Sequence, residues 1–123
     1  MTSPALTAAT VKRGDKTVTL TWTVVGDMPA HGTWLLSTTL VGGEDGPIHQ
    51  FGVKFLDGNL IAAFIFDQGK AFQYNFTDVS PTRIGDKWTA VFPVADVDIA
   101  ASGRWTAALN LDGNDTHRID GSL

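Results

Sequence analysis

Carboxylates and an amide gather near the C-terminus of this chain. Asp112, Asn114 and Asp115 lie close together, and His117 and Asp120 follow them. Oxygen ligands on a loop suit calcium, which takes carboxylate and carbonyl oxygens in a flexible geometry. The spacing lacks the glutamate that closes the standard calcium loop, and Asp, Gly and Asn are also ordinary hairpin-turn residues. We favour a turn here, with a calcium site at Asp112, Asn114 and Asp115 as the alternative.

The chain offers little for nucleophilic catalysis. It has no cysteine and no Gly-x-Ser-x-Gly elbow. Its histidines, His31, His49 and His117, are scattered and are more typical of surface or capping residues than of catalytic bases. Carboxylates can converge from distant strands to form a general-acid pair, but nothing in their spacing indicates one. We therefore expect a protein that is not an enzyme.

The aromatic residues are the most informative candidates for a binding site. A sheet face with more rings than its partner layer covers would leave a groove that stacks sugar rings or holds an apolar ligand. Trp and Tyr also need a hydrogen-bond partner or a wet edge for their polar ends. Core packing explains most of the rings, and Trp34, Tyr74 and Trp88 are the candidate ligand-binding residues.

Composition excludes several classes of protein. The chain has 123 residues, 9 basic and 13 acidic side chains, a net charge of -4 and no cysteine. Disulfides, thiolate zinc sites and iron–sulfur clusters are therefore excluded. The basic residues are scattered, so we expect no nucleic-acid partner. No apolar run is long enough to span a membrane, so we expect no membrane association. The oligomeric state is left open.

The length fits a single domain covering residues 1–123, without internal repeats or linkers. The N-terminal segment Met1–Leu6 lacks the basic region and the apolar stretch of an export signal. We expect either a cytoplasmic protein or a mature exported chain.

The elements that must position these residues are β-strands, because apolar residues recur at every second position. In Thr17–Val24, four apolar residues share one face and four threonines share the other, which predicts a strand with one wet face. The further strands predicted are Leu6–Val11, Trp34–Leu40, Phe51–Phe55, Leu60–Phe66, Phe72–Phe76, Lys87–Phe92 and Arg104–Leu111. The segment Pro93–Ser102 is predicted to hold one helical turn.

The pairing of two hairpins can be predicted from the same pattern. Asp57-Gly58 is a strong signal for a two-residue hairpin turn. A regular ladder from this turn pairs Phe55 with Leu60, Val53 with Ala62, Phe51 with Phe64 and His49 with Phe66. For the next hairpin we favour a three-residue loop, which pairs Phe66 with Phe72 and Phe64 with Tyr74.

About eight or nine short strands separated by turns indicate an all-β fold. We predict an antiparallel, jelly-roll-like β-sandwich, with a closed antiparallel β-barrel as the alternative. The segments 51–58, 63–67, 88–93 and 105–113 are similar to extracellular bacterial DOMON-like and family 9 carbohydrate-binding-like sandwich modules. The resemblance implies a ligand that is sugar, haem or calcium in different members. The chain shows no recognisable haem-ligand pair, and no ligand residue of the family can be transferred to it.

These observations favour a non-catalytic binding or accessory module for carbohydrate or another surface ligand. One alternative is a lipocalin-like binder of a small apolar molecule, since Gly32-Thr33-Trp34 is similar to the start of such barrels, although the later barrel pattern is absent. Another alternative is a structural or self-associating domain that uses a sheet edge. No cofactor is expected apart from the calcium alternative.

Overall fold

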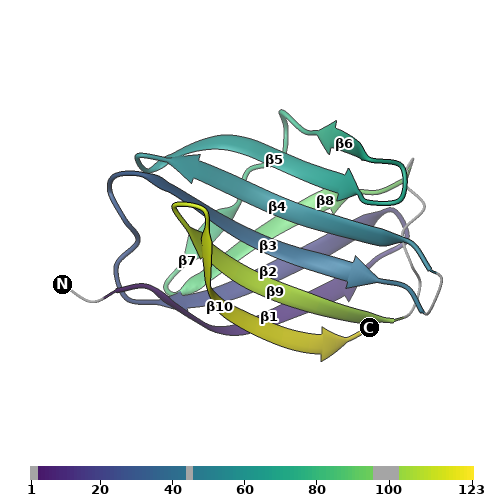
Figure 1. Ribbon diagram of the computed structural model, residues 1–123, viewed down its shortest axis with the longest axis horizontal. Helices are drawn as coiled ribbons and strands as arrows, with labels where there is room; N and C mark the ends of the chain where they lie inside the picture. The colour runs from purple at the N-terminus through teal and green to yellow at the C-terminus, as the bar shows by residue number, and fades with distance from the viewer. Residues whose placement is uncertain (1–2, 44–45, 96–102) are drawn as a thin grey trace.

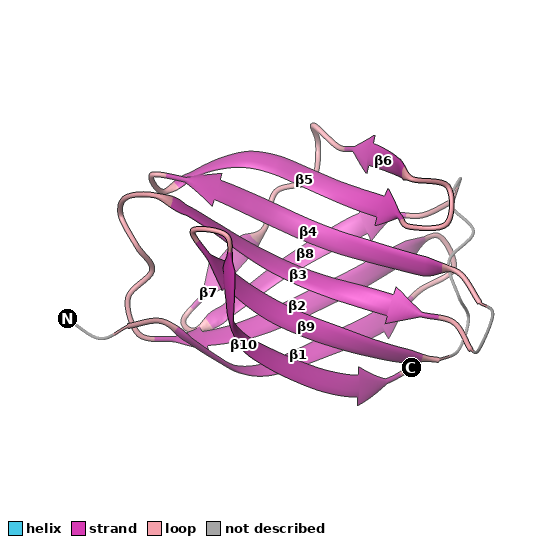
Figure 2. Ribbon diagram, viewed as in Figure 1, coloured by secondary structure: helices cyan, strands magenta, loops and turns pink. Residues whose placement is uncertain are grey.

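The computed structural model describes residues 3–43, 46–95 and 103–123, and these residues form strands and no helix (Figure 2). The strands are β1 (Ala5–Arg13), β2 (Thr17–Val25), β3 (Thr33–Val41), β4 (Ile48–Leu56), β5 (Asn59–Asp67), β6 (Phe72–Asn75), β7 (Thr82–Ile84), β8 (Lys87–Pro93), β9 (Arg104–Leu111) and β10 (Asn114–Ser122). The predicted all-β class is confirmed. No helix in the described ranges is long and apolar enough to cross a membrane.

The strands form two antiparallel sheets. One sheet has the order β1-β2-β8-β7, and the other has the order β10-β9-β3-β4-β5-β6. Figure 1 shows the six-stranded sheet lying in front of the four-stranded one. Within the described part of the chain no ladder joins one sheet to the other, so the closed barrel named as the alternative fold is wrong. The sheets instead keep their edge strands, of which β6 and β7 are the shortest.

Two strands, β7 and β10, were not predicted from the sequence. β7 has three residues, too few to show alternation, and β10 is rich in polar residues that resemble a turn. β10 pairs with β9 through the Asp112-Gly113 turn, so the polar C-terminal segment is an edge strand. The helical turn predicted for Pro93–Ser102 falls largely on residues 96–102, which lie outside the described residues.

The inward faces of both sheets meet in one apolar core. The alternating residues of β2 behave as predicted, since Leu20 and Trp22 are fully buried while the intervening threonines are partly exposed. Rings cross from one sheet to the other, with Phe51 of β4 lying 5.4 Å from Phe92 of β8 in an edge-to-face contact. The Trp22 indole N–H donates to the Thr38 hydroxyl at 3.0 Å, which satisfies its polar end inside the core.

A β-bulge changes the pairing of β4 with β5. Phe55 pairs with Leu60 as predicted, but Ile61 has no partner, and the next pair is Lys54 with Ala62. The predicted pairs Val53–Ala62, Phe51–Phe64 and His49–Phe66 are therefore wrong. The observed pairs are Val53–Ala63, Phe51–Ile65 and His49–Asp67.

The physical reason is the period of a strand, because one extra residue moves every later side chain to the opposite face. Ile65 consequently enters the core, where it is fully buried. Phe64 and Phe66 turn to the outer face of the six-stranded sheet. The Phe64 ring covers Gly52 of β4, so closely that a Cβ added there would stand 2.6 Å from the ring.

The pairing of β5 with β6 also differs from the prediction. Asp67 pairs with Phe72, Phe66 with Gln73 and Ile65 with Tyr74, so the predicted pairs Phe66–Phe72 and Phe64–Tyr74 are wrong. Four residues, 68–71, separate Asp67 from its partner, one more than we predicted. The Asp67 carboxylate accepts the Lys70 backbone N–H at 3.0 Å within this loop, which stabilises the longer turn.

Candidate binding groove

The structure brings Trp34 and Trp88 together, with Trp34 in the core and Trp88 partly buried against it. Trp34 is 2% exposed. It stacks on Phe55 with ring centroids 3.9 Å apart and meets Trp88 edge-on at 5.3 Å. The Nε1 atoms of both tryptophans are buried, and neither has a hydrogen-bond partner among the described residues. The Arg83 guanidinium covers Trp88 at 5.1 Å from its ring. Trp34 is therefore not offered to an open groove, and Trp88 is partly exposed at the margin of the core.

Tyr74 lies apart from the two tryptophans. It is half-buried on the short edge strand β6, and its ring meets that of Phe72 edge-on at 4.9 Å. The three aromatic residues chosen from the sequence therefore do not form one site.

The residues of the calcium alternative take part in the β9–β10 hairpin. The Asp112 carboxylate accepts the Thr33 backbone N–H at 2.9 Å, and the Asp115 carboxylate accepts an N–H of the Asn110 amide at 3.0 Å. Asn114 begins strand β10. Within the described residues no group of three or more His, Asp or Glu side chains gathers in a way that could hold a metal ion. The structure thus gives each of the two carboxylates a hydrogen-bonding role.

One histidine is buried beside a carboxylate. His49 of β4 is 1% exposed, and its Nε2 atom lies 3.3 Å from the Asp67 carboxylate of β5. The pKa of the Asp67 carboxyl is lowered, chiefly by the hydrogen bond from the Lys70 backbone N–H and further by the charges of His49 and Lys70. His31 is exposed in the β2–β3 loop, and His117 is half-buried on β10. This separation leaves the histidines without a shared site.

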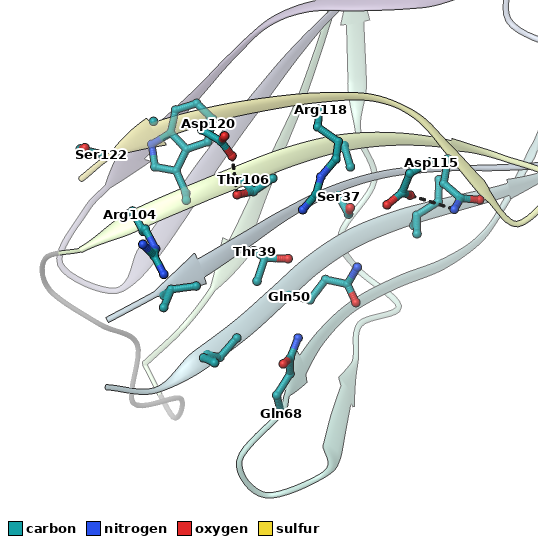
Figure 3. Close-up of a pocket in the computed structure, with 17 residues that line it drawn as sticks. Ser37, Thr39, Gln50, Gln68, Arg104, Thr106, Asp115, Arg118, Asp120 and Ser122 are labelled. Atoms are coloured by element: carbon teal, nitrogen blue, oxygen red, sulfur yellow. Dashed lines mark hydrogen bonds between the residues drawn. The ribbon is translucent and has the colours of Figure 1, made fainter. Parts of the chain in front are cut away.

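An open groove of about 750 Å³ lies on the outer face of the six-stranded sheet. It runs across strands β10, β9, β3 and β4 and reaches Gln68, which follows β5 (Figure 3). The outward residues of each strand supply most of its lining because side chains alternate between the two faces, and Trp105 with its partner Gly121 adds to them. The polar residues drawn and labelled there are Ser37, Thr39, Gln50, Gln68, Arg104, Thr106, Asp115, Arg118, Asp120 and Ser122.

The charges that line this groove are balanced. Arg104 and Arg118 supply two cations, and Asp115 and Asp120 supply two anions. Asp120 accepts a hydrogen bond from the Thr106 hydroxyl at 2.7 Å. Neither guanidinium has a hydrogen bond or ion pair with another residue that the structure describes. The groove therefore presents free donors next to carboxylates that are already oriented.

Uncharged hydrogen-bonding groups occupy the other half of the groove. Gln50 of β4 and Gln68 after β5 both turn toward it (Figure 3). Each amide carries one acceptor and one donor group, and neither amide bonds to another described side chain. Ser37 and Thr39 of β3 add hydroxyls between the charged and the amide-bearing ends. The site thus combines donors and acceptors along its whole length.

A second, more apolar hollow of about 490 Å³ lies at one end of the molecule. Met28 and Pro29 of the β2–β3 loop, Pro4 and Leu111 line it together with Asp27. Met28 and Leu111 also pack against the core.

Sequence reasoning missed the groove because it searched for aromatic rings. The sequence does carry a signal for this polar surface, since Thr39, Gln50 and Thr106 occupy the polar phase of predicted strands. Arg118 and Asp120 could not be placed from the sequence, because the polar residues of β10 resemble a turn. No family model matches this chain, and no curated protein and no solved structure is significantly similar to it.

Proposed function

We propose that this chain is a jelly-roll-like β-sandwich that acts as a non-catalytic binding module, and that it binds carbohydrate in the groove on the outer face of the six-stranded sheet. The observation that carries this proposal is the balance of charge and of hydrogen-bonding groups in the groove. It holds two guanidiniums, two carboxylates and three amides, together with hydroxyls, on one open face.

Sugar hydroxyls both donate and accept hydrogen bonds. A polyhydroxyl ligand therefore needs both kinds of partner along its length, which the arginines, aspartates and glutamines supply together. An anionic ligand would meet Asp115 and Asp120, and a cationic ligand would meet Arg104 and Arg118. The balance of charge thus favours a neutral ligand, such as an uncharged polysaccharide.

The carboxylates of the groove fit a binding role better than a catalytic one. Asp115 and Asp120 are exposed on the same edge strand. A glycosidase needs one carboxyl group whose pKa is raised, usually by burial, so that it can protonate the leaving group. The exposed positions of Asp115 and Asp120 provide no such burial.

Affinity electrophoresis through gels that contain single soluble polysaccharides, preceded by a glycan array, tests this function. The wild-type chain is expected to be retarded by at least one neutral polysaccharide. Arg118→Ala and Asp120→Ala should reduce the retardation, because each removes hydrogen bonds to hydroxyls. Lys12→Ala, which changes an exposed residue on the outer face of the other sheet, should leave it unchanged. A silent array together with unchanged mobility in every gel would refute the proposal.

The apolar hollow beside Met28 and Leu111 favours a second candidate function, the binding of a small apolar molecule. Its volume of about 490 Å³ is large enough for such a ligand. An environment-sensitive apolar dye should bind there with enhanced fluorescence, and Leu111→Arg should abolish the enhancement. Equal fluorescence of the two proteins would exclude this hollow as the binding site.

A further inference from the structure

Phe66 is an aromatic residue on a polar surface. Its Cα partner on β4 is Gln50, which lines the groove, so Phe66 lies on the same outer face. Its ring is only partly buried. The alternating pattern of β5 would have sent this ring into the core, and only the bulge at Ile61 turns it outward.

The neighbouring ring, Phe64, turns outward for the same reason but has a packing role. It covers Gly52 and is 8% exposed. A ring that covers a glycine of the adjacent strand stabilises the sheet at that point. Phe66 has no glycine opposite it, because its partners are Gln50 on one side and Gln73 on the other. Packing over a glycine therefore explains Phe64 but not Phe66.

Three amides surround Phe66. Gln50 and Gln73 stand beside it on the two adjacent strands, and Gln68 follows two residues later along the chain. The Gln73 amide donates to the Asn75 side chain at 2.7 Å and is thereby held in place. The amides of Gln50 and Gln68 bond to no other described side chain. A partly exposed aromatic residue is thus bordered by planar groups that can both donate and accept.

We propose that Phe66, Gln50 and Gln68 form a subsite at the β5 end of the groove, and that it takes a pyranose ring whose hydroxyls are all equatorial. Such a ring has two apolar faces of C–H groups and a rim of hydroxyls. One face stacks on the aromatic ring, and the rim bonds to the amides. An axial hydroxyl would interrupt the stacked face and would be left without a partner above the ring. This inference rests on the proposed carbohydrate-binding function and adds the class of sugar.

Titration calorimetry with two hexasaccharides tests the subsite. Cellohexaose and β-1,4-linked mannohexaose share a linkage and differ in the axial 2-hydroxyl of mannose. The wild-type chain should bind cellohexaose more tightly than mannohexaose. Phe66→Ala should raise the Kd for cellohexaose about two- to tenfold, the range expected for loss of one aromatic contact. It should also reduce the preference for cellohexaose over mannohexaose, whereas Phe66→Tyr should retain both affinity and preference.

Phe72→Ala is the matched control. Phe72 is 54% exposed on the adjacent strand β6. It pairs with the inward residue Asp67, so it lies on the opposite face from Phe66. This variant should bind cellohexaose like the wild type, and the melting temperatures of all variants show whether folding is retained.

The possible failures of the two proposals can be told apart. Binding of cellohexaose with the same Kd by the wild type and by Phe66→Ala would overturn the subsite and leave the groove in place. Binding of some other glycan on the array, without binding of cellohexaose, would likewise overturn the subsite and leave the groove in place. A chain that binds no glycan at all would overturn the carbohydrate function, and the subsite with it.

Discussion

Asp57 and Asp112 hold the start of strand β3 from its two sides, and each aspartate makes the same pair of hydrogen bonds. The Asp57 backbone N–H donates to the Gly32 carbonyl at 2.9 Å, and the Asp57 carboxylate accepts the Gly32 N–H at 2.7 Å. Asp112 repeats this arrangement with Thr33, at 2.8 Å and 2.9 Å. Both aspartates begin hairpin turns with φ of 50° and precede a glycine. Two hairpins far apart in the sequence thus hold the same end of the central strand.

We expect Asp112→Ala to lower the free energy of unfolding by about 1–2 kcal/mol, because it removes an acceptor and places alanine in the left-handed region. Asp112→Asn should cost less, since asparagine keeps an acceptor oxygen and tolerates that conformation. Urea denaturation measures both values. Asp15→Ala, in the exposed β1–β2 turn, serves as the control. Equal losses for Asp112→Ala and Asp112→Asn would contradict the proposed role of the carboxylate oxygen.

The close approach of Phe64 to Gly52 predicts a large effect from a small substitution. Gly52→Ala would place a methyl carbon 2.6 Å from the Phe64 ring and 3.1 Å from Leu35, and such overpacking costs about 1–3 kcal/mol. Adding Phe64→Leu should recover part of the loss. In Gly69→Ala the new carbon would lie 3.5 Å from its nearest neighbour, an ordinary contact, so that variant should be nearly neutral. A stable Gly52→Ala variant would show that the ring does not cover Gly52 in solution.

The tryptophans of the core should differ in their response to loss of the indole N–H. Trp22 donates to the Thr38 hydroxyl at 3.0 Å and to the Ser37 carbonyl at 3.1 Å, whereas the buried Trp34 N–H has no partner among the described residues. Trp22→Phe should therefore lower the free energy of unfolding by about 1 kcal/mol more than Trp34→Phe does. Guanidinium denaturation of the two variants gives the comparison. A greater loss for Trp34→Phe would be the contrary result.

The carboxylate of Asp67 should make stability depend on acidity. Because its pKa is lowered in the folded state, the unfolded chain binds this proton more readily, and protonation favours unfolding. The stabilisation is fully present above the ordinary pKa of about 4 and is lost as the pH falls through the lower, folded-state value. Melting temperatures between about pH 6 and pH 2 should fall less steeply for Asp67→Asn than for the wild type. Asp15→Asn, in the exposed β1–β2 turn, is the control, and identical slopes for wild type and Asp67→Asn would argue against this linkage.

The sequence predicts strands wherever local pattern and burial agree. Thr17–Val24 alternates without interruption, and its apolar residues are the buried ones. The same reasoning fails for β5 because both of its faces are apolar. Ile65 and Phe66 are equally suited to the core by residue type, and one unpaired residue decides between them. A bulge of this kind leaves no signal in an apolar run.

The groove was predictable only in part. Gln50 and Thr106 stand on the polar phase of predicted strands, so their outward direction followed from alternation. Arg118 and Asp120 did not, because β10 has too few apolar residues to show a strand period. Residue type alone favours Trp34 and Trp88 as ligand-binding residues, but the burial of Trp34 in the core is a tertiary property that type does not determine.

The unpaired Ile61 has a consequence for how this surface can change over generations. Deletion of that one codon would give a regular ladder with the same later pairs, because Ala62 would still face Lys54 and Phe64 would still face Gly52. Phe64 and Phe66 would stay on the outer face, and Ile65 and the acidic Asp67 would stay on the inner one. The bulge therefore takes up one residue of extra strand length, so the chemistry displayed at that end of the molecule is compatible with two lengths of the same strand.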